Sequence, residues 1–115
     1  MATLTEGKHA GEFIISEGNG WISREAVTIV AGQTLVSGTV LGKITASGKY
    51  AVYNNGAVDG TETAAGILYD DVDASAADVT GVVMIARMAE VNGDELTSND
   101  ANGTADLLAL DIIVR

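Results

Sequence analysis

The stretch from Ser23 to Ile44, SREAVTIVAGQTLVSGTVLGKI, constrains the fold of this chain more than any other feature. Apolar β-type runs at 26–30 and 40–44 flank a short run at 35–36, and glycines separate or interrupt them. β-Branched residues suit a pleated, half-buried surface, and glycine allows the positive φ of tight turns. The stretch therefore predicts a mainly β protein in which the rest of the chain supplies further strands.

The composition predicts one modest, aliphatic core. The chain has 115 residues, enough for a single domain, and 47% of them are hydrophobic. Only one Phe, one Trp and three Tyr are present, so Val, Ile, Leu and Ala must fill the core. With 14 glycines and no proline, the turns must be made by Gly, Asn, Asp and Ser.

The charge balance excludes several classes of partner. A net charge of −10 repels nucleic-acid phosphates and anionic membrane surfaces, and the six basic residues are scattered along the chain. There is no cysteine, no apolar signal segment at the start, and no apolar run near the ~20 residues of a membrane helix. We therefore expect a soluble, unexported protein that binds neither nucleic acid nor membrane directly.

The first residues predict an arm followed by a strand. Residues 1–11, MATLTEGKHAG, have no periodicity, which indicates a flexible arm. Residues 12–17, EFIISE, have the composition of a short strand that ends at Gly18-Asn19-Gly20. The sequence leaves two partners open for this strand: another strand of its own domain, or the sheet of another subunit.

Later segments alternate between strands and turns. Residues 40–45 and 49–53 predict a hairpin around Ala46-Ser47-Gly48. The Asn-Gly pair in Asn54-Asn55-Gly56 predicts a turn with positive φ. Residues 64–69 predict a buried strand that ends at Asp70-Asp71-Val72-Asp73, and residues 79–87 predict a central strand.

The C-terminal part predicts the one helix of the chain. Residues 74–78 indicate a loop or a single helical turn, and residues 89–91 extend the preceding strand pattern. Residues 104–110 predict a helix of about two turns after a Thr104 cap. Residues 111–115 return to β composition.

No pattern in the chain predicts catalysis, a metal site or a cofactor site. The only histidine, His9, lies in the expected arm, whereas a catalytic base needs a fixed geometry. The acidic residues 70–73 lack the glycine of an EF-hand loop, so a solvated turn is the preferred interpretation. Residues 18–23 lack the third glycine of a dinucleotide fingerprint. Trp21 fits core packing or an interface anchor.

Four segments in one order resemble the head decoration proteins of lambda-type tailed bacteriophages. They are SREAVTIVAGQTLVSGTVLGKIT at 23–45, GKYAVYNNGAVDGT at 48–61, AAGILYDDVDAS at 64–75 and GVVMIARMAEVNGDEL at 81–96. None of these motifs is catalytic, so the resemblance depends on their joint order and spacing. It extends over most of the chain, from about residue 11 to residue 115.

The resemblance implies a compact β-clip-like sandwich or barrel with one short C-terminal helix and a flexible N-terminal arm. It implies a homotrimer at three-fold positions on the outside of the mature capsid, stabilising the shell against the pressure of packaged DNA. The protein would be made in the host cytoplasm and end in the virion. The chain would divide into an arm and capsid-binding strand at residues 1–17 and a single β-rich decoration domain at residues 18–115. The residues expected to meet the major capsid protein are Glu12, Phe13, Ile14, Ile15 and Ser16.

A small β-barrel carrier or ligand-binding module is the alternative. Gly38-Thr39-Val40-Leu41-Gly42 is similar to the glycine turns of biotinyl and lipoyl domains, which present a modified lysine at a hairpin tip. Lys43 and Lys49 flank a predicted turn, without the residues that usually precede such a lysine. A lysine adduct in the native protein would distinguish a carrier from a decoration protein.

Overall fold

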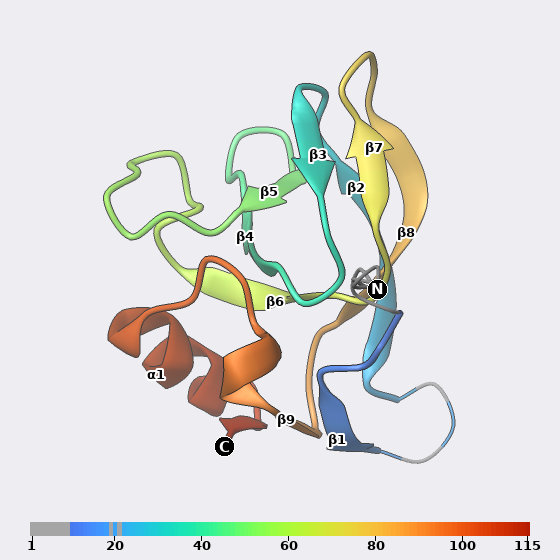
Figure 1. Cartoon of the computed structure of the whole chain (residues 1–115). Coiled ribbons are helices and arrows are strands. Elements are labelled where there is room, and N and C mark those ends of the chain that lie inside the picture. The colour runs from blue at the N-terminus through green and yellow to red at the C-terminus, as the bar shows by residue number, and fades with distance from the viewer. Residues whose placement is uncertain (1–9, 19, 21) are drawn as a thin grey trace, which may run out of the picture.

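The computed structural model describes residues 10–18, 20 and 22–115 and shows a mainly β protein (Figure 1). Its strands are β1 (Ile14–Glu17), β2 (Arg24–Ile29), β3 (Gln33–Leu35), β4 (Val40–Lys43), β5 (Tyr50–Val52), β6 (Ala64–Leu68), β7 (Val72–Ala74), β8 (Val79–Ile85), β9 (Ala89–Val91) and β10 (Ile112–Val114). A 3-10 helix, η1 (Gly93–Glu95), and an α-helix, α1 (Ala101–Ala109), lie between β9 and β10. The predicted β class with one short helix near the C-terminus is therefore confirmed.

A closed barrel forms the centre of the molecule. Its strand order is β2-β5-β4-β6-β8, and β2 closes it by pairing with β8 along most of its length. The predicted hairpin is present, because β4 and β5 pair antiparallel across the turn at residues 46–48. A two-stranded sheet, β3-β7, and a three-stranded sheet, β1-β9-β10, are attached to the barrel.

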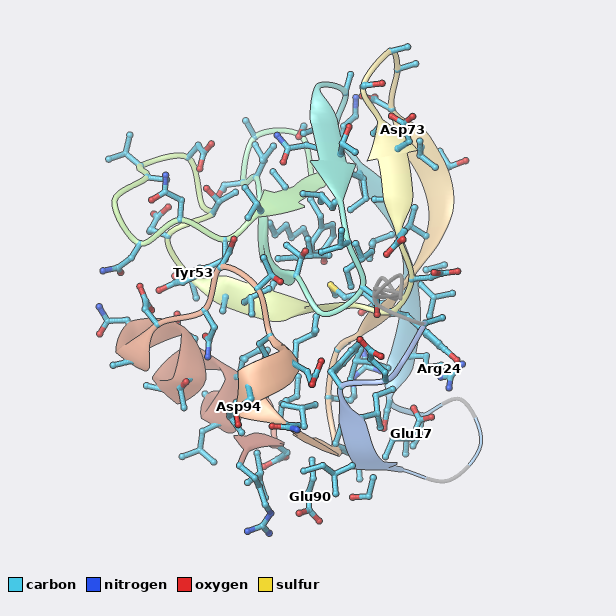
Figure 2. The ribbon with its side chains drawn as sticks, in the orientation of Figure 1. Glu17, Arg24, Tyr53, Asp73, Glu90 and Asp94 are labelled. Atoms are coloured by element: carbon cyan, nitrogen blue, oxygen red, sulfur yellow. The ribbon has the colours of Figure 1, made fainter. Side chains whose placement is uncertain are left out.

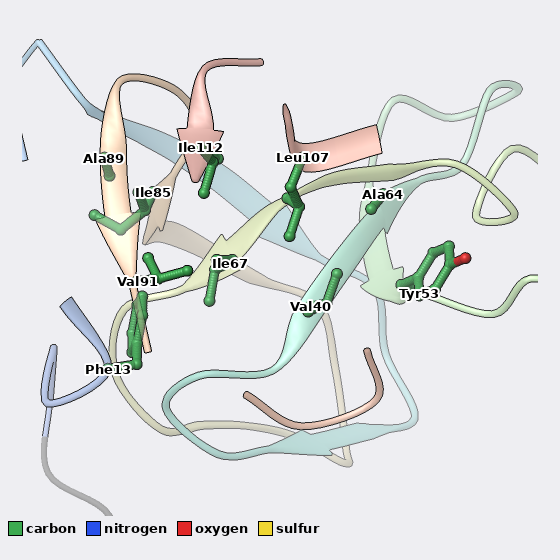
Figure 3. Packing of buried hydrophobic residues seen from close by; sticks show 10 residues of the cluster. All are labelled: Phe13, Val40, Tyr53, Ala64, Ile67, Ile85, Ala89, Val91, Leu107 and Ile112. Carbon is green, nitrogen blue, oxygen red and sulfur yellow. The ribbon is translucent and has the colours of Figure 1, made fainter. Parts of the chain in front are cut away.

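Strand β6, the first three residues of β4 and the last two residues of β8 are buried on both faces. Neighbouring side chains point to opposite faces of a strand, and on these strands both neighbours are apolar. One face contributes Val40, Ile67 and Ile85 to a cluster that packs under α1 and the three-stranded sheet (Figure 3). The other face contributes Leu41, Leu68 and Met84 to a second cluster toward β2 and β7. This double burial explains why apolar residues follow one another at 40–41, 67–68 and 84–85.

The strand predicted at residues 12–17 pairs within its own domain. β1 lies antiparallel to β9, with Ile14 opposite Val91 and Glu17 opposite Ala89. Phe13, just before β1, is fully buried among Val91, Ile112 and their neighbours (Figure 3). Of the two partners that the sequence left open, the structure shows the intradomain one.

The acidic turn and the strand after Ile85 differ from the sequence prediction. Val72–Ala74 is the strand β7, paired with β3, where the sequence predicted a solvated turn and a following loop. Residues 89–91 do not extend β8, because Met88 adopts a φ of 55° and turns the chain into the three-stranded sheet. Both differences arise from pairing with distant strands, which local composition does not encode.

The helix and the Asn-Gly turn also differ from their predictions. The helix begins at Ala101 and is capped by Asp100, whose side chain accepts a hydrogen bond from the Gly103 amide. Thr104 therefore lies inside the helix and is not its cap. The turn at Asn55-Gly56 is formed without positive φ at either residue.

Candidate functional site

The outer face of the three-stranded sheet is partly apolar and exposed. On the inner face Ala89, Val91 and Ile112 are buried in the core. On the outer face Ile15 of β1 is 54% exposed and Ile113 of β10 is 40% exposed. Exposed aliphatic side chains on an uncovered sheet face are a feature of contact surfaces. We call Ile15, Met88 and Ile113, with the polar residues between them, the β1 face.

Both borders of this sheet are open within the described part of the chain. The strand order is β1-β9-β10, so β1 and β10 each pair on one side only. An unpaired strand edge presents main-chain donors and acceptors that a segment of another protein can pair with.

Polar contacts order the centre of the β1 face. Glu90 lies between the two edge strands, accepting a hydrogen bond from the Ser16 hydroxyl at 3.2 Å and pairing with the Arg115 guanidinium. Its place at the lower border of the molecule is visible in Figure 2. The Arg115 side chain, and secondarily Ser16, lower the pKa of Glu90 below its ordinary value. The carboxylate therefore stays charged and holds β1 and β10 together across β9.

A second set of contacts attaches β1 to the barrel. Arg24 at the start of β2 pairs with Glu17 at the end of β1, at 2.7 Å (Figure 2). The hydrogen bond to Glu17 holds the pKa of Arg24 above its usual value. The same guanidinium lies 4.3 Å from the centre of the Tyr69 ring, and the Tyr69 carbonyl accepts a hydrogen bond from the Gly11 amide at 2.9 Å. The chain is therefore anchored to the barrel from Gly11 onward.

The residues expected to bind the capsid divide into two groups. Glu12, Ile15 and Ser16 are exposed, and Ile15 and Ser16 belong to the β1 face. Ile14 is half-buried, and Phe13 is fully buried in the core. Trp21 and His9 lie outside the described residues, as do residues 1–9 of the arm expected at residues 1–11, whereas Gly11 is bonded to Tyr69.

Sequence reasoning did not identify the other half of the β1 face. Met88, Glu90 and Ile113 lie far from β1 along the chain and reach it only through the pairing of β9 with β1 and β10. No periodicity marks Met88 or Ile113 as exposed, because both follow or interrupt buried apolar runs. Their place on the β1 face becomes evident only once the strand partners are known.

The acidic residues at 70–73 serve local structure. Asp71 accepts a hydrogen bond from the Ser37 amide at 2.8 Å, and Asp73 accepts one from the Ser75 amide at 3.0 Å. The hydrogen bonds from Ser75 lower the pKa of Asp73. Among the described residues no group of three or more His, Asp or Glu side chains is placed to hold a metal ion.

A groove of about 500 Å³ lies beside this segment, between β7 and the first half of β8. Its titratable lining consists of Arg24, Asp70 and Asp71 with the Tyr69 hydroxyl. Arg24 is paired with Glu17, and the two aspartates accept backbone hydrogen bonds. The groove thus lacks a nucleophile next to a base, which is the arrangement that covalent or acid-base catalysis needs.

The lysines of the hairpin do not have the placement of a carrier lysine. Lys43 is the last residue of β4 and lies opposite Tyr50 in the strand pair. Lys49 pairs with Asp78. The turn at 46–48 between the strands contains Ala, Ser and Gly, so neither lysine is at its tip.

No helix in the described part of the chain is both long and apolar enough to cross a membrane.

A search of curated proteins finds no match for this chain. A family model described as Bacteriophage lambda head decoration protein D matches residues 3–112. The match spans nearly the whole sequence, including β1, the barrel, α1 and the start of β10. The chain therefore belongs to the bacteriophage lambda head decoration protein D family, which is a structural family associated with the phage capsid.

Proposed function

We propose that this protein binds as a trimer at three-fold positions on the outside of the mature phage head and stabilises the shell against packaged-DNA pressure. The partner is the major capsid protein, and the final location is the outer surface of the virion. The proposal goes beyond the family assignment in its stoichiometry, position and mechanism. The observation that supports it best is the β1 face, an ordered, partly apolar sheet face with an open strand edge.

The open edge of β1 supplies a mechanism for attachment. A capsid-protein segment pairs with that edge through main-chain hydrogen bonds, and the arm at residues 1–9 extends the contact. Ile15 and Ile113 lose exposed apolar surface on binding. Three such contacts in one trimer act at high effective concentration, so avidity exceeds single-site affinity by about a hundredfold or more.

The stage of assembly provides the first test. Purified full-length protein is mixed with expanded heads and with unexpanded heads that lack it, and bound protein is measured after sedimentation. We expect saturable binding to expanded heads only, because the three-fold site is assembled by expansion. Equal binding to both kinds of head would refute the dependence on maturation.

Site-directed variants test the surface itself. Ile15→Asp places a charge on the β1 face and should weaken binding to expanded heads by at least about tenfold, since a desolvated charge opposes burial of that face. Val58→Asp is the matched control, because Val58 is 96% exposed on the loop between β5 and β6. Circular dichroism and thermal unfolding establish that both variants fold. Undiminished binding of folded Ile15→Asp would remove β1 from the interface.

The contribution of the arm needs a truncation that spares the core. Since Phe13 is fully buried, a deletion of residues 1–17 removes core packing together with the arm. Deletion of residues 1–9 leaves Gly11 and its hydrogen bond to Tyr69 in place. We expect this shorter deletion to keep the fold and lose affinity for expanded heads; full affinity would show that the arm does not bind.

A further inference from the structure

Asparagine followed by glycine is a chemically reactive pair, and the sequence contains it four times. Three of these pairs, at 55–56, 92–93 and 102–103, lie wholly in the described part of the chain, and Asn19 of the fourth lies outside it. The backbone nitrogen of the glycine attacks the side-chain carbonyl carbon of the asparagine, forming a five-membered imide with loss of ammonia. Water then opens the imide at either carbonyl and leaves aspartate or isoaspartate. Apart from water, the reaction needs no other reactant. It does need a glycine N–H that is free to leave its hydrogen bond and a backbone that can rotate.

Two of the three pairs are held in place by the fold. The Gly93 amide donates a hydrogen bond to the Arg115 carbonyl at 3.0 Å, while the Asn92 side chain accepts one from the Asp94 amide at 3.0 Å. The Gly103 amide donates to the Asp100 carboxylate at 2.7 Å in the first turn of α1. Rotation at the first pair breaks a contact between separate elements of the fold, and rotation at the second breaks the N-terminal cap of α1.

Packing also explains the presence of glycine at these two pairs. A Cβ atom on Gly93 would lie 2.9 Å from a Val114 methyl carbon. A Cβ atom on Gly103 would lie 3.1 Å from the Tyr53 ring. Glycine therefore leaves room for β10 beside residue 93 and for the Tyr53 ring beside residue 103.

The pair at 55–56 is restrained only within its own turn, where the Ala57 amide donates to the Asn54 carbonyl at 3.0 Å. Asn54, Asn55 and Gly56 are all exposed in the loop between β5 and β6, which projects at the left of Figure 1. The Gly56 amide donates only to the exposed Asn54 side chain, at 3.0 Å, a bond that water can replace. A Cβ atom on Gly56 would meet only that Asn54 oxygen, at 3.5 Å, and its φ is not positive. The fold does not require glycine here.

We propose that Asn55 is a site of spontaneous deamidation in the folded protein. Each event replaces a neutral amide by a carboxylate and so adds one negative charge to the loop. The isoaspartate product also lengthens the backbone by one methylene. The change stays local, because the Asn54 amide donates to the Thr61 carbonyl at 3.0 Å and the Thr45 amide donates to the Asp59 carbonyl at 2.9 Å, on the domain side of the modified pair.

Peptide mass mapping of the full-length protein provides the test. The folded protein is incubated at neutral and at mildly alkaline pH, digested at intervals, and scanned for the gain of about 1 Da that marks deamidation. We expect Asn55 to react at least about tenfold faster than Asn92 and Asn102, because opening those two pairs breaks the bond to Arg115 and the cap of α1, respectively. Similar rates at the three positions, or an unmodified Asn55, would overturn the proposal.

Two controls separate the fold from the local sequence. Gly56→Ala should slow the reaction at Asn55 by about tenfold, since a methyl group hinders attack by the amide nitrogen, and it should leave the unfolding temperature unchanged because the position is open. In denaturant the three pairs should react at similar rates. A preference for Asn55 that persists in denaturant would show that the fold does not select it.

Discussion

At the scale of single residues, Tyr53 and Asp100 connect the barrel to the helix. The Tyr53 ring is almost completely buried in the core cluster beside Ala64 and Leu107. Its hydroxyl donates a hydrogen bond to Asp100 Oδ1 at 2.8 Å, and the same carboxylate oxygen accepts a hydrogen bond from the Gly103 amide. The hydrogen bonds from Gly103 and Tyr53 lower the pKa of Asp100. One carboxylate thus caps α1 and satisfies the only polar atom of a buried ring.

Tyr53→Phe should destabilise the protein by about 1.5 kcal/mol, because it removes a hydrogen bond to a charged group. Urea unfolding measures the change. Tyr50→Phe is the control, since the Tyr50 ring is half-buried and no side-chain hydrogen bond to its hydroxyl is found among the described residues. Equal losses for the two variants would mean that the contact with Asp100 contributes nothing.

The same substitution should change stability at alkaline pH. Burial, and then the bond to Asp100, raise the pKa of Tyr53 from 10.0 to about 12. The unfolded chain therefore ionises first, and stability that is complete below pH 10.0 falls as the pH rises toward about 12. Tyr53→Phe should reduce this alkaline loss relative to the parent protein. If the unfolding free energies of the variant and the parent protein fell in parallel as the pH rises, Tyr53 would not be the group responsible for the alkaline loss.

Gly66 shows how closely β6 and β8 approach. A Cβ atom at this position would lie 2.6 Å from the Met84 sulfur and 2.7 Å from the Ile85 carbonyl oxygen. The sulfur can move, but the carbonyl belongs to the strand backbone. We expect Gly66→Ala to cost about 1–3 kcal/mol by overpacking, measured by urea unfolding. The open Gly56→Ala should cost much less, and equal costs would refute the packing argument.

At the scale of elements, β1 belongs both to the domain and to its proposed interface. Its inner side is continuous with the core through Phe13, and its outer side carries the exposed Ile15. Pairing with β9 fixes which side each residue faces. β1 can therefore contact a partner with Ile15 and Ser16 while its own place in the fold is secured by Phe13.

This double role leads to a prediction for truncations. Deletion of residues 1–9 should leave the unfolding temperature nearly unchanged, whereas deletion of residues 1–17 should cost at least about 3–5 kcal/mol, the usual cost of losing a buried Phe. Thermal unfolding of both truncated proteins checks this. A stable protein lacking residues 1–17 would show that the core closes without Phe13 and β1.

At the scale of the whole molecule, charge determines which partners are compatible. The chain carries 16 acidic and six basic residues, and Arg24, Lys49, Arg87 and Arg115 are each in an ion pair with an acidic side chain. Exposed pairs of this kind contribute little to stability, but they neutralise the positive charge that a phosphate would need. The remaining surface is acidic.

The protein should therefore not bind DNA, although it is proposed to act on a DNA-filled shell. Gel-shift titration with duplex DNA at low salt should show no complex, since low salt favours any phosphate contact that exists. A complex that weakens as salt is added would reveal a basic surface that the ion pairs do not neutralise.

The sequence by itself determined the local character of most segments. Runs of Val, Ile and Leu marked β4, β6 and β8, because strands buried on both faces need apolar residues at every position. The turn at 46–48 followed from its residue types, as did the approximate place of the helix. The absence of cysteine and the mobile position expected for His9 argued against a catalytic site.

Only the tertiary structure decided which segments meet. The closure of the barrel by β2 and β8, the pairing of β1 with β9, and the assembly of the β1 face from Ile15, Met88 and Ile113 all join residues far apart in the chain. The Asp100 cap was missed because its oxygen is positioned by Tyr53 as well as by the helix. Composition and periodicity describe what a segment can bury, whereas the choice of partner depends on the packing of the whole core.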